Sequence, residues 1–324
     1  MHLAALSGCD PELQVYTLSN DQLRLAFLPS CGGRLLGIEA FGQELLWQNP
    51  RLFDPSLRPR LPRTQWPPDT GTLANWANPG GSKTWPAPEG PGPGQWPGPP
   101  EPVLEMGPWL ISHAAQPGAV AVTMTSPFDP ATGLVIRRTY QLPTSGTTFT
   151  EVAHFTNASD TARTWSVWEV CQVATARGPD QPTRGVIEVA APSGTEGRVV
   201  AQAHGSVDLP VARQGWHRLA VPDFVGKVSF AQASGEVAYV DDAGPRLRLH
   251  FEPQEGLAYP NDSRVDLWMQ VPLADGLGPE FRYVHPRDNY IELEVLSPLT
   301  RLEPGDSVSL ALTWQVDLTT PRRT

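Results

Sequence analysis

The chain has 324 residues and a formal charge of −10. This charge excludes the basic surface that nucleic acid or an anionic membrane would require, so neither is an expected partner and a small neutral ligand is. The 36 prolines and 29 glycines interrupt most helical runs, and the 40% of apolar residues suffice for a core, so we expect an all-β protein.

The sequence shows neither a targeting signal nor a membrane span. Its first ten residues lack Lys and Arg, and no stretch approaches the roughly 20 apolar residues of a transmembrane helix. Cys9, Cys31 and Cys171 are odd in number and lack the spacing of a zinc or redox site. We therefore expect free thiols in a cytoplasmic protein without metal or cofactor; a nucleophilic Cys171 is the alternative, for which no positioned base is evident.

The first predicted element is a strand, turn, strand meander between residues 13 and 47. Leu23, Leu25 and Phe27 alternate along the first strand, and a glycine turn at residues 29–33 precedes the second.

Residues 50–108 are so rich in Pro and Gly that we expect no long helix or strand there, and we expect residues 78–89 to be loop. Loops of this length are usually functional or disordered. Disorder is disfavoured by five tryptophans, namely Trp66, Trp76, Trp85, Trp96 and Trp109. The region is predicted to be an ordered rim around a binding site, the alternative being a surface loop whose Trp plugs the core.

Strand patterns then recur, most of them bounded by Pro, Gly, Asn or Asp. They cover residues 120–125, 134–142, 149–155, 165–173, 186–190, 227–231, 237–240, 247–251, 264–271, 290–296 and 308–316. Because twist makes large sheets split into packed pairs, so many strands predict a large antiparallel sandwich. No composition shift marks a domain boundary, so we expect one domain over residues 1–324.

Three segments resemble the galactose mutarotase-like (aldose 1-epimerase-like) superfamily. They are residues 32–38 (GGRLLGI), residues 80–85 (GGSKTW), and residues 290–298 (YIELEVLSP) with the following turn at 302–307 and the closing strand with Trp314. Residues 83–89 and the pair Trp96-Pro97 are similar to an uncharacterised bacterial subgroup of that superfamily. The resemblance implies a β-supersandwich of galactose mutarotase-like type whose partner is a small-molecule sugar or sugar derivative.

The resemblance also implies an acid and a base. Mutarotases open an aldose ring with a late-strand glutamate as base and a histidine as acid. Glu292 and Glu294 occupy the late strand, alternate-residue geometry places both on one face, and both stay candidates for the base, the alternative being a solvated face. Asn78 stands where the family has its first histidine and cannot shuttle protons near neutral pH. His154 and His285 are the candidates for a replacement acid.

Further candidates for sugar binding are Arg34, Asn78, Lys83, Trp85, Glu169 and Trp268. Lys83 beside Trp85 offers hydrogen-bond donors next to a stacking face. Glu169 lies among apolar neighbours, where a carboxylate needs water or a cation as a partner. It is therefore expected either to face a solvated sugar-binding cleft or to form a salt bridge with Arg137 or Arg138.

Three functions stay open. The first is sugar binding with aldose 1-epimerase-like isomerisation, and the second is sugar recognition without catalysis, which the missing histidine at Asn78 motivates. The third is a glycoside hydrolase or lyase, which needs two carboxylates on opposite walls of a cleft, such as Glu169 opposite Glu292 or Glu294.

Overall fold

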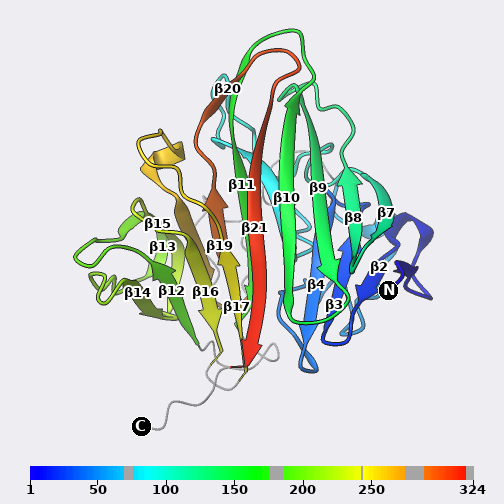
Figure 1. Ribbon diagram of the computed structural model, residues 1–324, viewed down its shortest axis with the longest axis horizontal. Coiled ribbons are helices and arrows are strands. Elements are labelled where there is room, and N and C mark those ends of the chain that lie inside the picture. Colours follow the sequence, from blue (N-terminus) through cyan, green and yellow to red (C-terminus); the bar gives the residue numbers. More distant parts are fainter. Residues whose placement is uncertain (69–75, 176–184, 242–243, 274–287, 319–324) are drawn as a thin grey trace.

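The computed structural model describes residues 1–68, 76–175, 185–241, 244–273 and 288–318. Its named strands form two sheets, one of 12 strands and one of nine (Figure 1). Within each sheet, all neighbouring named strands pair in the antiparallel direction. The prediction of a large antiparallel β-sandwich is confirmed.

The 12-stranded sheet runs in the order β1 (Ala4–Ala5), β2 (Tyr16–Ser19), β3 (Leu23–Leu28), β4 (Arg34–Ala40), β6 (Ser82–Ala87), β11 (Arg163–Ala174), β19 (Tyr290–Leu296), β18 (Val265–Gln270), β15 (Phe224–Phe230) and β13 (Arg198–Gly205). Two short strands pair from the side: β5 (Gln43–Glu44) with β4, and β20 (Thr300–Leu302) with β11.

The nine-stranded sheet runs in the order β14 (Trp216–Ala220), β12 (Val186–Ala190), β16 (Glu236–Val240), β17 (Pro245–His250), β21 (Ser307–Leu318), β10 (Thr148–Asn157), β9 (Leu134–Pro143), β8 (Ala119–Thr125) and β7 (Leu110–Gln116). The 3-10 helices η1 (Pro11–Leu13), η2 (Arg63–Gln65) and η4 (Pro260–Asp262) lie in the connections.

The two sheets pack face to face around a large apolar core. Rings from the two sheets meet there: the centroids of Phe27 on β3 and Tyr140 on β9 are 5.3 Å apart. Phe149 stacks on Trp314 with centroids 5.5 Å apart, both within the nine-stranded sheet. Alternate residues of each strand reach this core because successive side chains of a strand point to opposite faces.

Arg138 on β9 connects the two sheets through a fully buried guanidinium. It donates to Glu151 on β10 at 2.9 Å and to Glu169 on β11 at 2.9 Å. It also donates to the carbonyl oxygen of Ser82 on β6 at 3.0 Å, and the hydroxyls of Ser82 and Thr84 donate to Glu169. Glu169 therefore lies between the sheets. Of the two alternatives predicted for it, the structure has the salt bridge with Arg138 and not a position on a sugar cleft.

This buried group has one positive charge for two carboxylates. Burial raises the pKa of Glu169 to about 8, against the opposing effect of Arg138. The raised pKa favours the neutral form of Glu169, which lessens the charge imbalance of the group.

Residues 82–87, which the sequence predicted as loop, instead form the buried strand β6. Pro86 is tolerated within β6 because Val167, which lies opposite it on β11, makes its backbone hydrogen bonds elsewhere. The N–H of Val167 donates to Ser297 Oγ at 2.8 Å, and its carbonyl accepts from the Ser297 N–H at 2.9 Å. The missing N–H of proline therefore costs the ladder no hydrogen bond.

Gly81 brings β6 against β4. Its φ is +78°, and a Cβ at this position would lie 2.5 Å from the carbonyl oxygen of Leu35. The glycine pair predicted to let the chain approach a ligand closely thus lets two strands approach each other.

All eleven strand segments predicted between residues 120 and 316 coincide with strands, although their ends differ by up to three residues. Besides β6, the prediction missed β1, β7, β13 and β14, which lie at or next to the edge of their sheets, and the short β20, which pairs only with β11. Edge strands contact the core weakly, and most of the side chains of β7 are exposed. They therefore lack the apolar alternation on which the prediction rested.

A second, smaller core covers the other face of β3 and β4. Loop residues Leu52, Phe53 and Trp66 pack there against Leu28 and Leu36. Of the 50–108 region, residues 82–87 are thus a strand of the sheet, while Leu52, Phe53 and Trp66 belong to a layer that packs on it; residues 69–75 lie outside the described ranges.

We expect Arg138→Met to lower the free energy of unfolding by about 3–5 kcal/mol, because it leaves Glu151 and Glu169 buried without their cation. Urea unfolding followed by tryptophan fluorescence measures the loss. Arg301→Met is the matched control, since it removes an exposed pair with Glu303 and should cost less than about 1 kcal/mol. Equal losses in the two variants would contradict the role given to Arg138.

Candidate functional site

Alternation along β6, β11 and β19 separates two sets of polar side chains. The set that contains Glu169 points between the sheets, as described above. The other set points to the opposite side of the 12-stranded sheet, called here the outer face; it includes Lys83, Trp85, Trp168, Gln172, Glu292 and Glu294. The register confirms the grouping, since Gln172 lies directly opposite Glu292 and Trp168 directly opposite Trp85.

Glu292 is the centre of this face. Its Oε1 accepts from Lys83 Nζ at 2.9 Å and from Gln172 Nε2 at 2.9 Å. Within the described residues its Oε2 has no hydrogen bond, and 10% of the side chain is exposed. One carboxylate oxygen is therefore fixed by the protein while the other remains available to a ligand.

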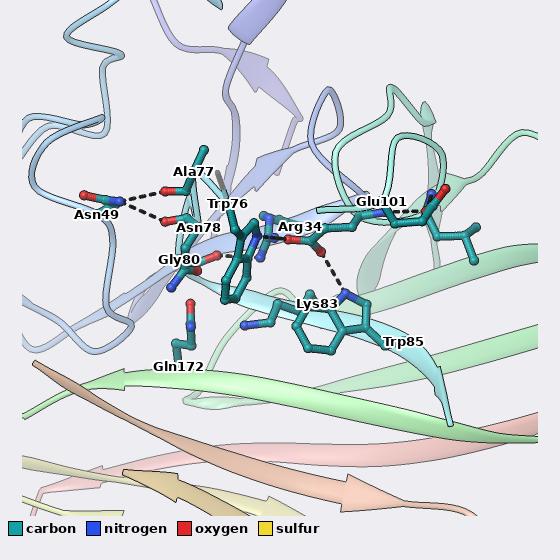
Figure 2. Close-up of polar contacts among 12 residues, drawn as sticks. Arg34, Asn49, Trp76, Ala77, Asn78, Gly80, Lys83, Trp85, Glu101 and Gln172 are labelled. Carbon is teal, nitrogen blue, oxygen red and sulfur yellow. Dashed lines mark hydrogen bonds and ion pairs between the residues drawn. The ribbon is translucent and has the colours of Figure 1, made fainter. Parts of the chain in front are cut away.

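Lys83 is held in an unusual environment for an ammonium group. Its side chain is 1% exposed, and burial lowers its pKa while Glu292 opposes that shift. Its Nζ lies 5.3 Å from the ring centroid of Trp76 and 4.7 Å from that of Trp85. Figure 2 shows the three side chains together beside β6.

A buried carboxylate from the loop region orients both indoles. Trp76 Nε1 donates to Glu105 Oε1 at 2.7 Å, and Trp85 Nε1 donates to Glu105 Oε2 at 2.7 Å. Arg34 forms a buried ion pair with the same carboxylate and donates to the carbonyl oxygen of Gly80 at 3.0 Å. Arg34 thus supports the indoles and is itself fully buried.

Glu294 lies on the same face as Glu292 in a more enclosed group. Lys227 Nζ is 2.8 Å from Glu294 Oε2 and 3.7 Å from Asp266 Oδ2, and Trp168 Nε1 donates to Glu294 at 2.7 Å. The Glu294 side chain is 0% exposed. Burial raises its pKa to about 8, with the Asp266 charge adding to the effect and Lys227 opposing it. Again one cation serves two carboxylates, and the raised pKa of Glu294 favours its neutral form.

Asn78 lies at the end of this face where β6 begins. Its Nδ2 donates to the hydroxyl of Tyr290 at 3.4 Å, and its Oδ1 is buried without a partner in the described structure. Its φ of +43° is unusual for a residue other than glycine. Asn49 donates to its carbonyl oxygen at 3.1 Å and so holds it there (Figure 2).

The structure does not bring all the predicted residues together. His154 lies on β10 of the other sheet, where it is partly exposed and its Nδ1 is 2.7 Å from Ser309 Oγ. His154 therefore lies on a different sheet from Glu292 and Glu294, the two candidates for the base. His285 lies outside the described residues. Trp268 is half-buried on β18, directly opposite Glu292.

Sequence reasoning assigned no role to Gln172, Glu105 or Lys227. Gln172 had a detectable signal, since it follows Trp168 by four residues on a predicted strand and so shares its face. Glu105 and Lys227 had none, because both reach the site from segments distant in sequence.

In the described ranges, no group of three or more His, Cys, Asp or Glu side chains is arranged to hold a metal ion. No described helix has the length and apolar character needed to cross a membrane.

Residues 13–317 match a family described as a domain of unknown function (DUF4380). No curated protein matches the chain. A galactose mutarotase-like protein from Clostridium acetobutylicum aligns with 98% of this chain and 99% of its own, at a TM-score of 0.59 and 9% identity. A galactose mutarotase-like protein from Lactobacillus casei aligns with 94% of this chain and 100% of its own, at a TM-score of 0.56 and 12% identity.

A TPR-domain containing protein from Parabacteroides distasonis also matches, with a TM-score of 0.61 and 14% identity over 94% of this chain. The chain spans about half of that protein, 47% of its length. These likenesses confirm the predicted galactose mutarotase-like fold, and at such identities they bear on the fold alone.

The protonated carboxyls predict a pH-dependent stability. In the folded chain the pKa of Glu169 and of Glu294 is raised to about 8, whereas an ordinary glutamate has a pKa of 4.5. Each carboxyl therefore binds its proton more strongly in the folded chain than in the unfolded one. The free energy of unfolding should therefore fall as the pH rises from about 5 to about 8, by at most about 1.4 kcal/mol per pH unit for each such proton.

Urea unfolding at several pH values tests this expectation. Glu294→Gln should give a shallower slope because glutamine does not titrate, whereas Glu303→Gln, at an exposed side chain, should leave the slope unchanged. A stability that rises over this range would show that the two carboxyls are ionised in the folded chain.

Proposed function

Because this chain belongs to the DUF4380 family, a domain of unknown function, we propose its role from its own geometry: it binds a sugar on the outer face of the 12-stranded sheet. The observation that carries the proposal is the Glu292 carboxylate, with Oε1 fixed by Lys83 and Gln172 and Oε2 available. The likeness of fold to galactose mutarotase-like proteins supports it.

The neighbouring indoles suit such a ligand. Trp268 is half-buried on the strand beside Glu292, and Trp76 and Trp85 lie around Lys83. The C–H face of a pyranose packs on an indole, while its hydroxyls form charge-assisted hydrogen bonds with carboxylate and ammonium groups. Glu105 fixes the indoles in advance, which lowers the entropy lost on binding.

We further propose that the protein interconverts the anomers of an aldose. Glu292 Oε2 removes the proton of the anomeric hydroxyl, the bond between C1 and the ring oxygen breaks, and the ring oxygen takes a proton from an acid. Rotation of the open-chain aldehyde and the reverse steps give the other anomer. Exposure favours Glu292 over Glu294 as base, since 10% of its side chain is exposed against 0%.

Lys83 is our candidate for the acid that protonates the ring oxygen. The amide of Asn78, which stands in the place of the mutarotase histidine, cannot donate a proton near neutral pH. The Lys83 ammonium is 2.9 Å from Glu292, so a sugar held by that carboxylate lies within its reach. Burial lowers its pKa, which makes it a better proton donor than an exposed lysine.

Sugar recognition without catalysis is the second candidate. Asn78 stands in the place of the mutarotase histidine, and His154 lies on the other sheet; both observations favour this function.

A glycoside hydrolase or lyase would need two carboxylates on opposite walls of a cleft. Glu169 points between the sheets, so it cannot oppose Glu292 or Glu294 in this way. A cytoplasmic location remains part of the proposal; the free thiols of Cys9, Cys31 and Cys171 agree with it.

We expect Glu292→Gln to slow anomer exchange by about 10²- to 10⁴-fold, because it removes the base without changing the shape of the side chain. Glu294→Gln should retain most of the activity. Polarimetry on freshly dissolved glucose and galactose measures exchange, and titration calorimetry measures binding.

Circular dichroism confirms that each variant folds. Binding without faster exchange in the natural protein would select the recognition function. Absence of binding to every aldose tested, or an equal loss of exchange in both variants, would contradict the site.

A further inference from the structure

The outer edge of β7 differs from the other edges of the two sheets. Natural proteins protect such edges with short strands, charged side chains, prolines or bulges, because an open row of N–H and C=O groups pairs with other chains. Among the described strands, β1 has two residues, β13 begins with Arg198 and has two register irregularities against β15, and β14 presents Arg218. β7 has seven residues, none of them Lys, Arg, Asp, Glu or Pro, and its register with β8 is regular. It therefore has none of these protections.

The edge is exposed and held in place at both ends. Every residue of β7 except Ile111 is exposed, with Leu110 at 80%. Within the described part of the chain, β7 pairs with β8 alone and ends the nine-stranded sheet (Figure 1). The N–H of Trp109 donates to the carbonyl oxygen of Pro29 at 2.8 Å and fixes the beginning of the strand, and the turn to β8 fixes its end. The edge is thus formed before any partner binds.

The two-residue turn between β7 and β8 determines which backbone groups face outward. Gln116 and Ala119 flank this turn and pair directly, so they exchange hydrogen bonds with each other. Bonded and non-bonded pairs alternate along an antiparallel ladder. The N–H and C=O groups of Ile111, His113 and Ala115 therefore point away from β8, and no hydrogen bond joins them to another described residue.

We propose that two copies of this chain pair through β7, as antiparallel strands related by a twofold axis at His113, and so join their nine-stranded sheets into one. In this register His113 pairs with its counterpart and Ile111 pairs with Ala115 of the other copy. Every outward N–H and C=O of the strand then obtains a partner. Ser112 lies opposite Ala114, and these small side chains do not obstruct the contact.

Charge favours a second copy at this edge. The chain carries a formal charge of −10, so two copies repel each other over most of their surfaces. Neither β7 nor its neighbour β8 has a Lys, Arg, Asp or Glu, so pairing here places no like charges opposite each other. One strand edge is smaller than a standard protein interface, and we therefore expect a weak dimer with a Kd on the order of 10 μM.

Sedimentation velocity on the full chain, at concentrations from well below to well above this Kd, measures the association. We expect the sedimentation coefficient to rise with concentration to that of a dimer. Hydrogen exchange followed by mass spectrometry should show slower exchange of residues 110–116 in the concentrated sample. A monomer at every concentration, growth beyond a dimer, or association that leaves exchange at residues 110–116 unchanged would overturn the proposal.

Two substitutions at the axis test the register. His113→Pro removes an N–H that does not bond to β8, so the strand should keep its ladder while the Kd rises by at least about tenfold. His113→Glu places two carboxylates opposite each other and should weaken the dimer by a similar factor. Circular dichroism and urea unfolding establish that each variant folds.

Thr150→Glu is the matched control. It adds the same charge at an exposed position of β10, an interior strand of the same sheet, and should leave the Kd within about twofold of the natural protein. Equal weakening in His113→Glu and Thr150→Glu would place the contact elsewhere and contradict the proposal. The sugar site lies on the other sheet, so this outcome is independent of the proposed function.

Discussion

The arrangement of the two sheets depends on one buried cation. Arg138 projects from the nine-stranded sheet, and its guanidinium is satisfied by Glu151 on the same sheet and by Glu169 and Ser82 on the other. The planar guanidinium presents its donors in fixed directions, so these partners admit one relative placement of β9, β6 and β11. A buried charge without its partners is costly, and alternative placements of the sheets are disfavoured by that cost.

This constraint on the inner side also determines the outer face. Side chains alternate along a strand, so when Ser82 and Glu169 point toward Arg138, Lys83 and Gln172 must point away from it. The two residues then meet at Glu292 of the neighbouring strand. The inner ionic group therefore acts as a positioning device for the outer one, although the groups lie on opposite sides of the sheet.

On both sides of the 12-stranded sheet, one buried cation contacts two carboxylates. Arg138 serves Glu151 and Glu169, and Lys227 serves Glu294 and Asp266; in each group burial raises the pKa of one carboxyl to about 8. Lys83 and Glu292 are the exception, with one charge of each sign and a carboxylate whose side chain is 10% exposed, against 0% for Glu294. That difference separates the chemically available carboxylate from those that hold the structure.

The sequence alone determined the all-β class, the interior strands and the common face of Glu292 and Glu294, because these follow from apolar alternation and the two-residue period of a strand. It did not reveal β6, since Pro86 and the glycine pair are typical of a loop and become acceptable only through the specific pairing with Val167 and Leu35. Tertiary structure also decided that Glu169 faces Arg138, that Glu105 orients two indoles, and that Glu292 is reachable where Glu294 is not. Each of these rests on contacts between residues far apart in the chain, and burial and pairing of that kind leave no local pattern in a single sequence.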